Sequence, residues 1–214
     1  TLFVVCSIFL SGCHRASKIE VYRAEKHQQD SIAFIEQQKS LDYYQSQLEI
    51  LVPRVDSLLK LFKYEKNEKY QDKGYYYHPS QSSSYNAQRS YLQAIIQDDG
   101  LAIIKCFYYG AHPLRSPHIV LQAQDIELVL HGKTHSFDAN GWHQITTIDD
   151  STAMQALRFI DAYAQDQIRV RYANETQSGV CFYINEADKK TLLQSFQLAI
   201  TISDIRELEK RIRI

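Results

Sequence analysis

The sequence predicts an α+β protein, in which a long N-terminal helical stalk resembling a coiled coil precedes a mostly antiparallel β-sheet domain with two helices. Two observations lead to this prediction. Between residues 18 and 70, apolar residues recur at heptad spacing without any glycine. After residue 89, short β-rich runs alternate with turn residues, and only two stretches have helical spacing.

The composition excludes some classes of protein. The chain has 214 residues, of which 44% are hydrophobic and 23% charged. This suffices for one folded core plus an elongated element, and it is too apolar for a disordered chain. The formal net charge of -1 creates no global basic field, so we expect no nucleic acid partner. The 15 tyrosines against 7 glycines favour aromatic-rich strands or an interaction surface.

The chain begins with an uncharged apolar run over residues 1–12, which ends in small residues before Cys13. Spanning a bilayer takes about 20 residues, so this shorter run suits the hydrophobic region of a signal peptide. The alternative is a buried strand or helix of the core. The polar residues directly after Cys13 disfavour that alternative.

The residues Leu10-Ser11-Gly12-Cys13 resemble the lipobox of bacterial lipoproteins. The resemblance implies that residues 1–12 are removed as a signal peptide and that Cys13 carries a lipid. It also implies a cell-envelope protein that is held to a membrane by its first residue. In a Gram-negative cell, His14 after the cysteine is consistent with the outer membrane, facing the periplasm. The resemblance covers four residues and implies nothing about activity.

Residues 31–70 are predicted to form the helical stalk, after a loosely ordered tether over residues 13–30. Because Pro53 removes one helical hydrogen bond, we expect a kink or a break there. The heptad seam predicts pairing with another helix, which could belong to an envelope protein partner, to a second copy of the chain or to the C-terminal end of the same chain. The seam consists of Phe34, Leu41, Tyr44, Leu48, Leu51, Val55, Leu58 and Phe62.

Residues 71–88 combine serine, proline and glycine with several tyrosines, which predicts a linker before a folded domain of residues 89–214. The tyrosines are typical of a binding loop or of side chains that pack the helix against the domain. The packing role is favoured. Within the domain, Asp98-Asp99-Gly100 is typical of a hairpin turn. Strands are expected over residues 91–97, 101–109, 119–122, 126–130, 134–137, 142–148, 168–173 and 180–184. Helices are expected over residues 152–165, capped by Asp150-Ser151, and from 186 towards 212, capped by Asn185.

Three histidines form the one cluster that resembles a metal site. His131 and His135 flank a tight turn, and His143 follows on the next predicted strand. Imidazole is a common zinc ligand, so the three could approach each other across the strand ends. No cysteine or carboxylate completes the spacing, and histidines in turns are usually solvated. A metal-dependent enzyme or metal-binding protein is therefore the alternative function.

Cys106 and Cys181 lie in predicted strands, and outside the cytoplasm they could form a disulfide. Two buried free thiols are the favoured alternative, because cysteine is among the most buried residue types. The adjacent aspartates are explained by turn and cap chemistry, and we find no phosphate-binding loop or nucleophile elbow. The sequence does not decide whether the chain is an enzyme. It favours a non-catalytic binding or structural module without a cofactor.

Overall fold

The fold is described from a computed structural model. It describes residues 18–66, 74–81, 89–111, 114, 118–138, 142–174 and 177–213. The predicted signal peptide and Cys13 lie outside these residues. The chain divides into two compact units, Thr1–Ser46 and Gln47–Ile214. None of the described helices has the length and apolarity that crossing a membrane requires.

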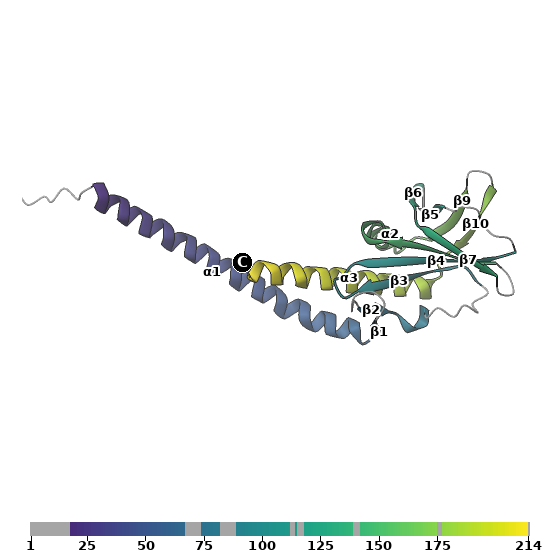
Figure 1. Ribbon diagram of the computed structural model, residues 1–214, viewed down its shortest axis with the longest axis horizontal. Helices are drawn as coiled ribbons and strands as arrows, with labels where there is room; N and C mark the ends of the chain where they lie inside the picture. The colour runs from purple at the N-terminus through teal and green to yellow at the C-terminus, as the bar shows by residue number, and fades with distance from the viewer. Residues whose placement is uncertain are drawn as a thin grey trace, which may run out of the picture. The chain divides into compact units, whose positions relative to one another are not determined.

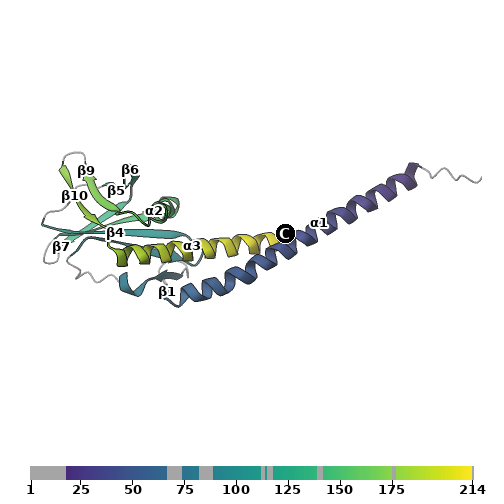
Figure 2. The ribbon, with the colours of Figure 1, turned by 180° about the vertical axis from the view of Figure 1, so that it is seen from behind.

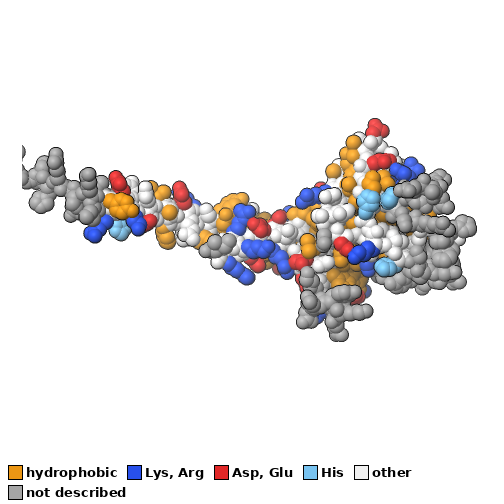
Figure 3. All heavy atoms as spheres, turned by 45° about the horizontal axis from the view of Figure 1, so that its top comes forward, with side chains coloured by type: hydrophobic (Ala, Val, Ile, Leu, Met, Phe, Trp, Pro, Cys, Tyr) orange, Lys and Arg blue, Asp and Glu red, His pale blue; other side chains and the backbone are white. Residues whose placement is uncertain are grey.

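The first helix, α1, spans Lys18–Leu59 and runs through Pro53, so the predicted break at the proline does not occur. Pro53 is exposed, so its ring faces solvent rather than a packed neighbour. The helix starts well inside the tether predicted for residues 13–30, since no glycine or proline interrupts the chain between Lys18 and Val52. In the first unit α1 exposes apolar side chains, and Figure 3 shows charged side chains of both signs along it.

The stalk predicted to reach residue 70 ends at Leu59, because the chain then enters a sheet. The strands β1 (Lys63–Lys66) and β2 (Gly74–Tyr77) pair with each other, and β2 also pairs with β3 (Tyr91–Gln97). The short helix η1 (Pro79–Gln81) follows β2. The segment predicted as a linker over residues 71–88 therefore contributes an inner strand of a sheet.

Two antiparallel sheets build the second unit (Figures 1 and 2). The six-stranded sheet has the order β1-β2-β3-β4-β8-β7 and the four-stranded sheet the order β10-β9-β5-β6. The remaining strands are β4 (Ala102–Gly110), β5 (His118–Ala123), β6 (Ile126–Leu130), β7 (Lys133–Asp138), β8 (Trp142–Asp149), β9 (Arg169–Asn174) and β10 (Gln177–Tyr183). With α2 (Asp150–Ala162) and α3 (Glu186–Ile212), they confirm the predicted α+β class.

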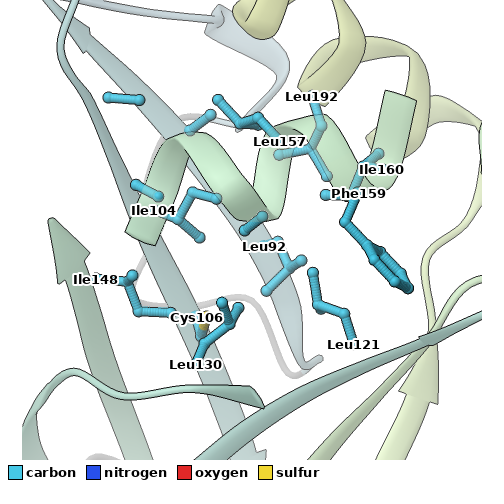
Figure 4. Close-up of a cluster of buried hydrophobic side chains, with 14 of the residues drawn as sticks. Leu92, Ile104, Cys106, Leu121, Leu130, Ile148, Leu157, Phe159, Ile160 and Leu192 are labelled. Atoms are coloured by element: carbon cyan, nitrogen blue, oxygen red, sulfur yellow. The ribbon is translucent and has the colours of Figure 1, made fainter. Parts of the chain in front are cut away.

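The core lies between the two sheets and the two helices of the domain. The helix α2 contacts strands of both sheets and also α3, which packs on β3. Leu58, close to the end of α1, belongs to the same buried cluster, so this end of the helix is part of the domain. Figure 4 shows core side chains around α2, namely Leu92, Ile104, Cys106, Leu121, Leu130, Ile148, Leu157, Phe159, Ile160 and Leu192.

Polar contacts join the two sheets and cap the helices. The phenol of Tyr172 on β9 donates to the carbonyl oxygen of Phe107 on β4 at 2.7 Å, so one buried hydrogen bond joins the two sheets. Burial raises the pKa of Tyr172 well above its ordinary value. At α3 the predicted cap is confirmed, since the side chain of Asn185 accepts from the backbone N–H of Asp188. The helix α2 is capped instead by Asp149, without a side-chain hydrogen bond.

Both cysteines of the domain are free thiols, so the disulfide considered from the sequence is not formed. They lie in different sheets, Cys106 on β4 and Cys181 on β10. Cys106 is buried, and burial raises the pKa of its thiol. Cys181 is exposed, and its sulfur accepts from Nη2 of Arg169 at 3.3 Å. The expectation of buried thiols therefore holds for Cys106 alone.

Candidate functional site

The six-stranded sheet has a second face, turned away from the core. Side chains alternate along a strand, so the neighbours of the core residues of β3 and β4 point to this face. The strand register places Tyr91 opposite Phe107, and Gln93 opposite Lys105. The core cluster contains none of these four residues. We define the outer face by Glu65, Tyr75, Tyr77, Tyr91, Gln93, Ile95, Ile103, Lys105 and Phe107.

One carboxylate orders the tyrosines of β2. Oε2 of Glu65 accepts from the phenol of Tyr75 at 2.6 Å, and Oε1 accepts from the phenol of Tyr77 at 2.6 Å. These two hydrogen bonds lower the pKa of Glu65. The bond to Glu65, with a smaller contribution from burial, raises the pKa of Tyr75 to about 12. The two phenol rings are therefore held in place by a charged group on the neighbouring strand.

The middle of the outer face carries polar groups with unused bonding capacity. Lys105 is half-buried, and burial lowers the pKa of its ammonium group, while Glu65 acts in the opposite direction. Gln93, opposite Lys105, is only 3% exposed, and Gln81 of η1 is 2% exposed. The side-chain oxygen of each glutamine has no hydrogen-bond partner. Buried acceptors of this kind are usually satisfied, so an enclosed water is expected there.

The amide nitrogens of the two glutamines are engaged, which fixes their oxygens. Nε2 of Gln93 donates to the backbone oxygen of Gln81 at 2.6 Å. Nε2 of Gln81 donates to the backbone oxygen of Leu92 at 3.1 Å. Because both amides are oriented by the backbone, the two oxygens are fixed in enclosed positions.

Stacked aromatic rings flank this polar group. Tyr91 and Phe107 stack with ring centroids 4.4 Å apart and planes at 4°. The guanidinium of Arg89 lies over Tyr91, 4.9 Å from the ring centroid, and binds the buried carboxylate of Asp188 at 2.5 and 3.0 Å. The bond to Asp188 raises the pKa of Arg89. This chain of contacts ties the start of β3 to the first turn of α3.

A serine and a histidine lie close together at η1, but a local cap explains them. Oγ of Ser80 lies 2.7 Å from Nδ1 of His78, as a nucleophile and its base would. The backbone N–H of Ser80 donates to the same nitrogen at 3.3 Å, so the imidazole caps the short helix. Burial, followed by the charge of Lys190, lowers the pKa of His78. We assign no catalytic role to this pair.

The structure does not place the three predicted metal ligands as a trio. His135 is exposed on β7, and its register partner on β8 is Ile145. His143 pairs with Phe137 in the backbone register, and its side chain lies outside the described residues. Where side chains are described, no three His, Cys, Asp or Glu come together as metal ligands. The three-histidine site therefore stays a prediction.

His131 lies beside a histidine that is not among the three predicted ligands. Its ring centroid is 5.0 Å from that of His118, with the planes at 69°. The predicted strands of residues 119–122 and 126–130 form a hairpin. Its register places the next two residues outward, His118 and His131, opposite each other, so the hairpin was the signal for this contact. Comparison of the chain with protein-family models, with curated proteins and with solved structures gives no match.

The bond between Glu65 and Tyr75 predicts an unusual phenol titration. We expect Tyr75 to ionise at about 12, and to return towards the ordinary value of 10.0 in Glu65→Gln, because the charged acceptor is lost. The raised pKa stabilises the folded state below the ordinary phenol pKa, and this stability is lost as pH rises through about 12. NMR titration of ring-labelled tyrosine measures it. Glu127→Gln on β6 is the control, and an unchanged Tyr75 midpoint in Glu65→Gln would contradict the assignment.

Proposed function

We propose that the chain is a cell-envelope lipoprotein, anchored by a lipid on Cys13, whose domain binds an envelope component through the outer face without catalysing a reaction. The anchor is supported by the lipobox-like residues 10–13. His14 supports a location at the outer membrane, facing the periplasm. The observation that carries the binding role is the accessible part of the outer face, where Glu65 of β1, the two tyrosines Tyr75 and Tyr77 of β2, and Lys105 of β4 lie on one side of the sheet.

The chemistry of this face suits recognition of a polar, partly apolar partner. Tyr75 and Tyr77 are half-buried and oriented by Glu65, so they present rigid rings with little entropy left to lose. The half-buried ammonium group of Lys105 supplies one charged donor group. Such a group fixes the orientation of a partner on an otherwise aromatic surface.

The first unit offers a separate contact. Among its described residues, large apolar side chains on α1 are exposed, with Phe34 at 66% and Ile35 at 52%. Exposed apolar side chains do not stabilise an isolated helix in water, whereas a partner helix would bury them. This supports the pairing proposed for the stalk, either with an envelope protein or with a second copy.

Photocrosslinking in the native envelope tests the binding role. A benzophenone amino acid placed at Tyr77 is expected to give a discrete crosslinked product, because the side chain lies on the outer face. The same probe at Tyr183, which is 53% exposed on the other sheet, is the matched control. Adding Lys105→Glu to the Tyr77 probe is expected to reduce the product. No product from Tyr77, or the same product from both positions, would contradict the proposal.

A further inference from the structure

Two histidines lie opposite each other where the four-stranded sheet begins. Ile119 of β5 pairs with Leu130 of β6, so the register continues to His118 and His131. Directly opposite residues of antiparallel strands have Cβ atoms about 5 Å apart. The two imidazole rings are in contact, with centroids 5.0 Å apart, and Figure 3 shows histidine side chains exposed on the face of the domain that it draws.

We propose that His118 and His131 chelate one divalent transition-metal ion of the zinc or copper type. A zinc–nitrogen bond is about 2.1 Å, and the centre of an imidazole ring lies about 1.1 Å beyond the ligating nitrogen. At a tetrahedral angle, two imidazoles on one ion then have centres about 5 Å apart. The separation of 5.0 Å therefore matches the one that chelation requires.

Rigid elements hold both ligands. His118 opens β5, whose next residue, Ile119, is fully buried. His131 follows Leu130, which is 1% exposed, and precedes Gly132. A Cβ atom at Gly132 would lie 2.4 Å from the backbone oxygen of Thr147, so this segment runs tightly against β8. Little movement is needed for binding, and the entropy cost of assembling the site is small.

The remaining coordination positions face solvent. His131 is exposed and His118 half-buried, so an ion reaches the pair without opening the core. Two imidazoles leave positions for water or for a donor group of another molecule. This arrangement agrees with the finding that the described residues bring no third ligand to the pair. The site lies on the other sheet from the outer face, so it does not rest on the proposed binding role.

Calorimetric titration of the tag-free full chain in detergent with Zn²⁺ tests the pair. Loss of a group that only supports a metal ligand usually weakens binding about 10–100-fold. We therefore expect His118→Ala and His131→Ala each to weaken zinc binding at least about tenfold. His135→Ala, exposed on β7, is the matched control and is expected to bind as the unaltered chain does.

Binding of Cu²⁺ gives a spectroscopic signal from its nitrogen ligands, which binding to a thiol does not give. Electron paramagnetic resonance with less than one Cu²⁺ per chain is expected to show two imidazole nitrogens in the unaltered chain and one in each single variant. Thermal unfolding without metal checks that each variant folds, and His118→Asn and His131→Asn replace an alanine variant that does not. No binding by the unaltered chain, equal binding by all variants, or an equal loss in His135→Ala would each overturn the proposal.

Discussion

Gly100→Ala is expected to lower the free energy of unfolding by about 2–5 kcal/mol. Gly100 has φ +82°, a left-handed conformation that costs a residue with a side chain about 1–2 kcal/mol. A Cβ atom there would also meet the carbonyl oxygen of Ala199 and the amide nitrogen of Ser203, both at 2.9 Å. These are backbone atoms of α3, which cannot rotate away, so overpacking adds about 1–3 kcal/mol.

Denaturant unfolding, followed by the fluorescence of the single tryptophan, Trp142, measures this effect. Gly100→Asn separates the two causes, because asparagine tolerates the left-handed conformation and retains the clash with α3. Leu101→Ala, at a neighbouring position that is 40% exposed, is the control and should cost less than about 1 kcal/mol. Equal losses in Gly100→Ala and Leu101→Ala would show that the hairpin does not pack on α3 as described.

Leu157→Ala is expected to lower the free energy of unfolding by about 2–5 kcal/mol. Leu157 is fully buried on α2, and Figure 4 shows it among Leu92, Ile104 and Leu192, which come from β3, β4 and α3. Its loss leaves a cavity where these elements meet, and the surrounding strands cannot collapse into it without breaking their pairing. The same denaturant experiment measures the change.

Arg158→Ala on the same helix is the matched control for the core. Arg158 is exposed, so its removal should change the free energy of unfolding by less than about 0.5 kcal/mol. Comparable losses of stability in Leu157→Ala and Arg158→Ala would contradict the packing of α2 against strands of both sheets.

The parts of the fold that local sequence determines could be predicted. The hairpin at Asp98-Asp99-Gly100 and the cap at Asn185 depend on turn and cap chemistry within a few residues. The strands β1 and β2 could not, since residues 63–66 are charged apart from Tyr64 and look like the end of the helix. Pairing with β3, many residues later, decides their structure, and such tertiary pairing overrides local preference.

The candidate site depends on strand register, which the sequence does not reveal. Gln93 and Lys105 meet only because β3 and β4 pair around the hairpin in one particular register. Glu65 reaches Tyr75 and Tyr77 only because β1 pairs with β2, where a helix and a linker were predicted. The contact of His118 with His131 also follows from a register, that of β5 and β6, but here the short hairpin of residues 119–122 and 126–130 gave a signal in the sequence.

The central claim is that a lipid on Cys13 anchors this domain in the cell envelope. Mass spectrometry of the chain purified from the membranes of a bacterium that expresses it tests this most directly. We expect a mature chain that begins at Cys13, carries the added mass of a covalent lipid on that residue and lacks residues 1–12. Cys13→Ala should lose both the cleavage and the lipid, whereas Cys6→Ala, at the other cysteine of the N-terminal segment, should lose neither. A chain that retains residues 1–12 with an unmodified Cys13 would contradict the account.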